Sequence, residues 1–168
     1  DFAMEDITGT SGILSLCGPT AEGTLKALGL PTPQETWSHE AGRLEGHAVR
    51  VVRSGHLRRA CFDIWAEPSV LPTLWSTLVD SGAQPAGKHA FEYLRIEEGV
   101  PTYPKEFGDH CTPLDAAGTD GLTDGKGCYP GQEVIERTIA LGRPSRVLVG
   151  LQSDGILHAG DAITMDGV

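Results

Sequence analysis

The residues best suited to chemistry lie together in segment 126–133, which reads Lys-Gly-Cys-Tyr-Pro-Gly-Gln-Glu. Cys128 stands two residues after Lys126 and just before a predicted helix start. A nearby cation and a helix N-terminus both stabilise a thiolate. Gly127 and Gly131 let the backbone approach a ligand closely. The segment therefore predicts a working thiol at Cys128 with Lys126 as its electrostatic partner. The alternative is a cysteine that packs as a small apolar side chain.

The polar residues around this thiol have two possible roles. Glu133 and the preceding Gln132 fall in the first turn of the predicted helix, where they either cap it or bind a ligand donor. Arg137 and Arg143 follow within a few residues. Together with Lys126 they form a local positive patch on a chain whose net charge is −10. Such a patch favours a small ligand that carries a carboxylate, and its alternative is a solvated basic face.

The composition of the 168 residues excludes several classes of protein. A net charge of −10 opposes general nucleic-acid binding and docking to an anionic membrane, and no transmembrane or signal segment is present. The four cysteines show neither metal-site spacing nor the density of a disulfide scaffold, which predicts reduced thiols in a cytoplasmic protein. Cys17 and Cys61 are expected in the core, whereas the role of Cys111 stays open. We read the histidines, which have no ligand spacing, as surface residues.

Hydrophobic periodicity predicts the elements that must position the motif. Strands are expected at 13–17, 44–52 (a hairpin) and 60–65, and helices at 19–28, 69–80 and 88–98. In the last helix Phe91 and Leu94 are expected to face inward. This order predicts an α+β fold, related to the ferredoxin-like layout, with helices on one face of an antiparallel or mixed sheet.

The remainder of the chain holds a long loop and a second domain. Residues 100–125 are poor in apolar side chains, and a loop of this length beside the thiol is expected to be functional. A helix at 130–138 and strands at 146–152 and 162–165 follow, with a domain boundary near 144. Both ends of the sequence look cut, so a fragment of a longer protein is expected.

At 126–133 the chain resembles the YgfZ family, folate-binding proteins related to the aminomethyltransferase (T-protein) of the glycine cleavage system. Residues 13–21 resemble that family's strand, Gly-Pro-x-Ala and helix unit, and residues 94–99 resemble its Leu-Arg-Leu-Glu-Ala-Gly segment. Arg137, Arg143 and Arg146 resemble its trailing arginine positions. The resemblance implies a ferredoxin-like central domain at 1–143 and the start of a small β-barrel domain at 144–168.

The resemblance also implies a function: binding of tetrahydrofolate and support of iron–sulfur cluster assembly or repair, and through it tRNA modification. Iron–sulfur client proteins would be its partners, with no direct nucleic-acid or membrane contact, and a monomer is expected. The implied site comprises Lys126 and Cys128 as working residues, and as folate-binding residues Gly127, Tyr129, Gly131, Gln132, Glu133, Arg137 and Arg143.

Two residues differ from the aminomethyltransferase pattern, and these differences bear on which activity is expected. Arg59 stands where those enzymes carry a folate-contacting Glu, and Phe91 stands where they carry an Arg. Loss of buried hydrogen-bonding groups changes specificity strongly, so aminomethyl transfer is not expected. The alternatives are an aminomethyltransferase of the glycine cleavage system and a binding module without chemistry, in which Cys128 only packs.

Overall fold

The structure, a computed structural model, describes residues 2–109, 111–116, 121–123, 125–158 and 160–164. The chain divides into two compact units, Asp1–Val100 and Pro101–Val168. This division falls earlier in the chain than residue 144, where the sequence predicts a domain boundary. The boundary at 144 and the two domains that it separates stay a prediction.

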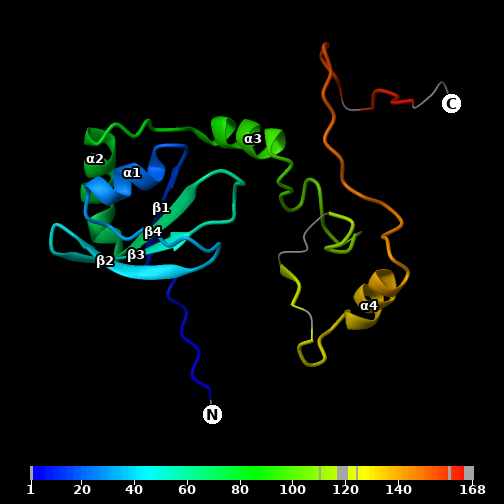
Figure 1. Ribbon diagram of the computed structural model, residues 1–168, viewed down its shortest axis with the longest axis horizontal. Helices are drawn as coiled ribbons and strands as arrows, with labels where there is room; N and C mark the ends of the chain where they lie inside the picture. Colours follow the sequence, from blue (N-terminus) through cyan, green and yellow to red (C-terminus); the bar gives the residue numbers. More distant parts are fainter. Residues whose placement is uncertain (1, 110, 117–120, 124, 159, 165–168) are drawn as a thin grey trace. The chain divides into compact units, whose positions relative to one another are not determined.

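The first unit is built on a four-stranded antiparallel sheet with the strand order β1-β4-β3-β2 (Figure 1). Its strands are β1 (Gly12–Cys17), β2 (His39–Leu44), β3 (His47–Arg53) and β4 (Cys61–Ala66). Alternating apolar residues predict β1, β3 and β4, because successive side chains of a strand point to opposite faces. Strand β2 begins at His39, five residues before the predicted hairpin, in a segment without apolar alternation. The predicted strands and the hairpin are confirmed.

A two-residue turn at Glu45 and Gly46 joins β2 to β3, and Leu44 pairs with His47 across it. Both turn residues have positive φ, 49° and 86°. Hairpins of this length favour such a turn because its twist matches that of the two strands. The turn thereby fixes the register of the outer half of the sheet.

Helices α1 (Ala21–Ala27) and α2 (Leu71–Asp80) cover one face of the sheet, and the 3-10 turn η1 (Pro68–Val70) leads into α2 (Figure 1). The buried cluster joins Leu25 of α1 and Leu74 of α2 to Phe62 and Ile64 of β4, which have no exposed surface. Phe62 and Ile64 are two residues apart and share one face of β4. The core therefore lies between these helices and the sheet, as the sequence predicts.

The α+β class is confirmed, but the order of elements differs from a ferredoxin-like fold. That fold places a helix between its third and fourth strands. Here β2, β3 and β4 follow one another and both later helices come after β4. Adjacent antiparallel strands need only a short connection, so residues 54–60 suffice to join β3 to β4.

Helix α3 (Lys88–Glu97) buries a different side chain from those predicted. Arg95 is 3% exposed, whereas Phe91 is 40% exposed and Leu94 is half-buried. Arg95 donates to the Glu92 carboxylate at 2.8 Å and to the carbonyl of Val100 at 3.2 Å. These partners allow a charged side chain to be buried where an apolar one was expected.

The described part of the second unit contains one helix, α4 (Gln132–Ala140), close to the predicted 130–138. No strand occurs among its described residues, so the strand predicted at 146–152 is wrong. The strand predicted at 162–165 is also wrong for residues 162–164. Its last residue, Met165, lies outside the described residues. A strand needs a hydrogen-bonded neighbour, whereas the N–H of Leu148 donates to the carbonyl of Asp115. The barrel domain stays a prediction.

Candidate functional site

The predicted thiol motif lies in the second unit, directly before α4. Cys128 is a free and exposed cysteine. The ammonium of Lys126 lies 4.5 Å from the centre of the Tyr129 ring, which is a cation–π contact. Lys126 is therefore held at the ring of Tyr129, three residues after it in the motif. Its role as the electrostatic partner of Cys128 stays a proposal.

The start of α4 follows from a glycine. Gly131 is the N-cap with φ of 86°, a left-handed conformation that suits glycine, and it makes no side-chain cap hydrogen bond. Gln132 is half-buried, and the exposed Glu133 lies in the first turn, where the helix dipole favours a carboxylate. Gly127 is exposed, and a Cβ there would meet no atom within 4 Å. These four residues surround Cys128 in sequence, and their ligand role stays untested.

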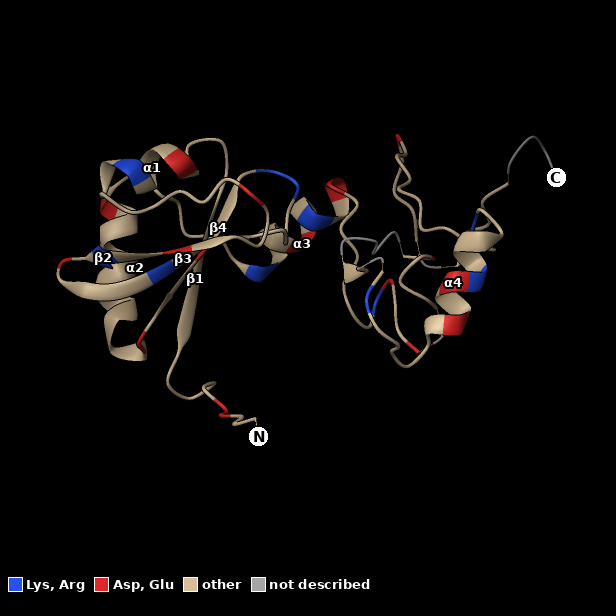
Figure 2. Cartoon of the chain, turned by 60° about the horizontal axis from the view of Figure 1, so that its bottom comes forward, with Lys and Arg blue, Asp and Glu red and all other residues tan. Residues whose placement is uncertain are grey.

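The expected basic patch is interleaved with acids. Arg137 lies in the last turn of α4 and Arg143 follows the helix, both exposed. Glu133 and Glu136 are exposed on the same helix, and Figure 2 shows both acidic (red) and basic (blue) segments on α4. The helix thus presents both signs of charge, which reduces its attraction for anions relative to a purely basic face.

A small cavity of about 160 Å³ lies between the long loop and residues 146–148. Cys111 and Asp115 line it, and the Arg146 side chain is near the Asp115 carboxylate. The N–H and hydroxyl of Thr112 donate to that carboxylate at 2.8 and 2.9 Å. These hydrogen bonds, with a smaller contribution from Arg146, lower the pKa of Asp115. Part of the long loop is therefore ordered by its own polar contacts.

A second polar cluster, which the sequence reading missed, lies in the first unit. Asp63 of β4 is 6% exposed. The Ser15 hydroxyl donates to Asp63 Oδ1 at 2.6 Å, and Nε2 of His56 lies 3.5 Å from Oδ2. The Trp37 ring meets the edge of the His56 ring at 5.4 Å. A Cβ on Gly55 would come within 2.6 Å of the Trp37 side chain, so only glycine fits there.

The feature of the sequence that could have revealed this cluster is Asp63, an acid between two apolar residues of a predicted strand. Asp63 alternates with Phe62 and Ile64, so it points to the face opposite the helices. Its partner Ser15 is directly opposite it in the β1–β4 register. The sequence reading placed His56 on the surface, and its side chain is indeed 59% exposed, but it is also paired with Asp63. A buried carboxylate on an uncovered sheet face can accept hydrogen bonds from a ligand.

Arg59, the residue that departs from the transferase pattern, is paired with two acids at the C-terminal end of α3. Its Nε donates to Glu98 Oε1, and its guanidinium lies 3.6 Å from the exposed Glu97 carboxylate. The backbone N–H of Arg58 also donates to Glu98, at 2.5 Å. Burial raises the pKa of Glu98, but the hydrogen bonds from Arg59 and the two backbone N–H groups outweigh burial and lower it. Residue 59 is therefore an arginine, but a carboxylate, that of Glu98, lies next to its side chain.

Two of the four cysteines are joined, which corrects the prediction that all are reduced. Cys17 and Cys61 form a disulfide between residues 44 apart in sequence. They lie opposite each other where β1 and β4 pair, so the sheet register brings the two sulfur atoms together. Cys61 is buried, as predicted, and Cys17 is half-buried. Cys111 and Cys128 are free.

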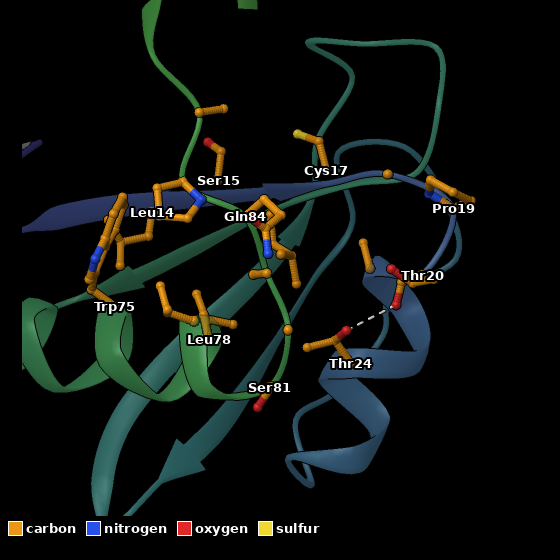
Figure 3. Close-up of a pocket in the computed structure, with 18 of the residues that line it drawn as sticks. Leu14, Ser15, Cys17, Pro19, Thr20, Thr24, Trp75, Leu78, Ser81 and Gln84 are labelled. Atoms are coloured by element: carbon orange, nitrogen blue, oxygen red, sulfur yellow. Dashed lines mark hydrogen bonds between the residues drawn. The ribbon is translucent and has the colours of Figure 1, made fainter. Parts of the chain in front are cut away.

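A cavity of about 650 Å³ lies in the first unit between α1, α2, α3 and β1. Figure 3 shows Trp75 and Leu78 of α2 on one side, Thr20 and Thr24 on the other, and Gln84 between them. The sequence reading named none of these as site residues, because their pattern is that of ordinary core positions.

Two kinds of site are absent from the described residues. They contain no group of three or more His, Cys, Asp or Glu side chains placed to hold a metal ion. None of their helices is both long enough and apolar enough to cross a bilayer.

Comparisons with known proteins show the family of the chain. Residues 1–119 match the model of the GCVT N-terminal domain. The chain is 32% identical over 170 residues to an aminomethyltransferase of Nostoc sp., covering 98% of the chain and 45% of that protein. An aminomethyltransferase of Rubrobacter xylanophilus is 32% identical over 178 residues, with coverage of 99% and 46%. A putative chloroplastic transferase of Arabidopsis thaliana is 29% identical over 166 residues, covering 98% and 38%.

A solved structure supports the same relationship. The glycine cleavage system aminomethyltransferase T from Bartonella henselae matches with a TM-score of 0.65 and 25% identity, over 82% of this chain and 38% of that one. The chain therefore spans less than half the length of these relatives. The specific link to YgfZ finds no support among them, whereas the wider T-protein relationship does. The chain belongs to the GCVT N-terminal domain family.

Proposed function

We propose that this chain is part of a tetrahydrofolate-dependent aminomethyltransferase of the glycine cleavage T-protein type. The observation that carries the proposal is similarity along nearly the whole chain to proteins named aminomethyltransferase in two distant bacteria. This reverses the preference drawn from Arg59 and Phe91. A carboxylate, Glu98, stands beside Arg59, and we propose that it takes the role of the acid missing from the sequence at position 59.

The reaction proposed moves one carbon between two carriers. The methylene carbon of an aminomethyl group leaves a lipoyl sulfur and its own amine, and bonds to two nitrogen atoms of tetrahydrofolate. The two N–H protons displaced from those nitrogen atoms go to the sulfur and to the amine, which departs as ammonia. No electron is gained or lost overall. Tetrahydrofolate supplies the two nucleophilic nitrogen atoms.

Each unit, taken by itself, contains residues whose chemistry suits a group of a folate. Asp63 uses one oxygen for Ser15 and the other for His56, and a carboxylate has about four acceptor sites, so it can still accept N–H groups of a pterin ring. Arg137 and Arg143 are exposed cations that suit the glutamate carboxylates. The motif residues Lys126 to Glu133 would shape the turn that holds the ligand.

The test uses the full-length protein with an aminomethylated lipoyl carrier protein and tetrahydrofolate. Formation of methylenetetrahydrofolate and ammonia in equal amounts supports the proposal. Asp63→Asn is expected to raise the KM for tetrahydrofolate, whereas Asp154→Asn, an exposed acid elsewhere, leaves it unchanged. Absence of product with a carrier that a known aminomethyltransferase accepts would contradict the proposal.

The second candidate is a YgfZ-like role in iron–sulfur cluster assembly or repair, acting through Cys128 and bound tetrahydrofolate, with tRNA modification as a consequence. The observation that favours it is the exposed free thiol within the Lys-Gly-Cys-Tyr-x-Gly-Gln-Glu signature. Complementation of a strain lacking YgfZ tests it. Restored iron–sulfur enzyme activity with the wild type but not with Cys128→Ala supports this role, and equal rescue by both rules out the thiol.

Each of the two candidate functions implies partner proteins, which we also propose. A lipoyl carrier protein would serve the first, iron–sulfur clients the second, and the protein itself is proposed to be a monomer without nucleic-acid or membrane partners. A cytoplasmic location remains a prediction, and the Cys17–Cys61 disulfide opposes it, because such bonds are uncommon in reducing compartments.

A further inference from the structure

The 650 Å³ cavity of the first unit has dimensions typical of a small-molecule site. Sites for drug-sized ligands occupy about 300–1,000 Å³ and are mainly apolar. Leu14 and Leu16 of β1 form its floor, and Leu78 and Phe91 come from two different helices. Trp75 and Phe91 remain 47% and 40% exposed, so aromatic surface faces open space.

The described lining of this cavity contains no Asp, Glu, Lys, Arg or His, although 21% of the chain is charged. Its polar side chains are neutral hydroxyls and one amide, such as Thr20, Thr24, Ser81 and Gln84. Burial of an unpaired ion costs far more than burial of a neutral ring. A ligand with a charged group inside this cavity would find no opposite charge among the described residues there.

We propose that this cavity binds an uncharged aromatic ring compound of about 10–20 non-hydrogen atoms. The ring would lie against Trp75 and Phe91, and a hydroxyl or carbonyl of the ligand would meet Gln84. Aromatic pairs gain energy beyond their buried area, which favours a flat ligand over an aliphatic one. The proposal does not rest on the folate-binding role proposed above.

The experiment titrates the full-length, 15N-labelled protein with 1-naphthol and with 1-naphthoate, its charged counterpart. The chain has three tryptophans, so the indole N–H signals of Trp37 and Trp65 serve as internal controls. The signal of Trp75 is expected to shift with 1-naphthol while the other two stay in place. The affinity for 1-naphthoate is expected to be at least about tenfold weaker, because its carboxylate lacks a partner.

A charge placed in the wall tests the cause of this preference. Val79 lines the cavity and is 37% exposed, so Val79→Lys is expected to fold and to reverse the order, with 1-naphthoate binding more tightly. Ile96→Lys is the matched control, since Ile96 is an exposed helical residue outside the lining, and it should keep the wild-type preference.

Three outcomes would overturn the proposal. One is an unmoved Trp75 signal at saturating 1-naphthol, which would mean that the cavity is closed or filled by another segment in the full-length protein. Another is equal affinity for the two probes. The last is competitive displacement of 1-naphthol by tetrahydrofolate, which would make the cavity part of the folate site. Loss of aminomethyltransferase activity would leave this proposal untouched, so the two failures are distinguishable.

Discussion

The two units differ in how their side chains are buried. Among the described residues, fourteen of the sixteen buried hydrophobic residues lie in 1–100, and only Ala116 and Ile135 lie in 101–168. The second unit nevertheless holds the thiol motif, and its helix exposes Val134, Ile139 and Leu141. The thiol motif at 126–133 therefore lies in the unit whose described residues bury few apolar side chains. Its geometry therefore depends more on polar contacts, such as those of Asp115, than on packing.

The largest effect should come from the core of the first unit. Phe62 has no exposed surface, so Phe62→Ala is expected to reduce the free energy of unfolding by about 3–5 kcal/mol. Leu141→Ala, at an apolar residue that is 73% exposed in the second unit, should change it by less than about 0.5 kcal/mol. Urea denaturation of both variants measures the contrast. Equal losses of unfolding free energy would mean that Leu141 is buried in a hydrophobic core of the second unit.

The disulfide should contribute the next largest share, again in the first unit alone. A cross-link between residues 44 apart removes loop entropy from the unfolded chain, which stabilises by up to about 4 kcal/mol. Reduction should therefore lower the denaturation midpoint, and Cys17→Ser with Cys61→Ser should reproduce the reduced protein. Alkylation before and after reduction should count two and four thiols in this chain. Four thiols without reductant would contradict the pairing.

The Asp63 cluster should matter less, but measurably. Ser15→Ala removes a 2.6 Å hydrogen bond to a buried carboxylate and is expected to cost about 1–3 kcal/mol. Ser38→Ala is the matched control, because its hydroxyl makes an equally short bond to the Glu35 carbonyl at the surface. Thermal unfolding of the two variants compares them. An equal effect would show that burial at Asp63 adds nothing.

The pH dependence of stability gives a smaller and more selective test. The pKa of Glu98 is lowered in the fold from its ordinary value of 4.5. Its ionised form therefore stabilises the fold above about pH 4.5, and that stabilisation is lost as pH falls through the lowered pKa. Glu98→Gln should thus destabilise the protein near pH 6 and approach the wild type near pH 3. A difference that does not change with pH would rule out the charge as the cause.

The smallest effect is expected at the motif itself. Cys128 is exposed, so Cys128→Ala should leave the free energy of unfolding within about 0.5 kcal/mol of the wild type. Lys126→Met should cost no more than about 1 kcal/mol through the lost contact with Tyr129. Denaturation curves check both. A large loss at Cys128 would support the packed-cysteine alternative over a functional thiol.

The sequence predicted what depends on local pattern. Alternation located β1, β3 and β4, and apolar spacing located the helices, because burial on one face requires that periodicity. Most of β2 was missed, because His39–Leu44 has no such alternation. The Cys17–Cys61 pair and the Ser15–Asp63 contact were out of reach, since both depend on which strands are neighbours. The burial of Arg95 was also missed, because its partner Val100 O lies beyond the end of its helix. At 146–152 the strand pattern was present, but the described residues of the second unit contain no strand to pair with it.

The pairing of Arg59 with Glu98 constrains how this chain can change over time. Glu98 stands where the related segment has Ala, and Arg59 stands where the transferases have Glu. Replacing Arg59 by Glu alone would set two carboxylates side by side and remove the partner of a largely buried acid. Replacing Glu98 alone would leave the arginine without that neighbour. The two positions are therefore expected to have changed together, and relatives with an acid at the first should have a neutral residue at the second.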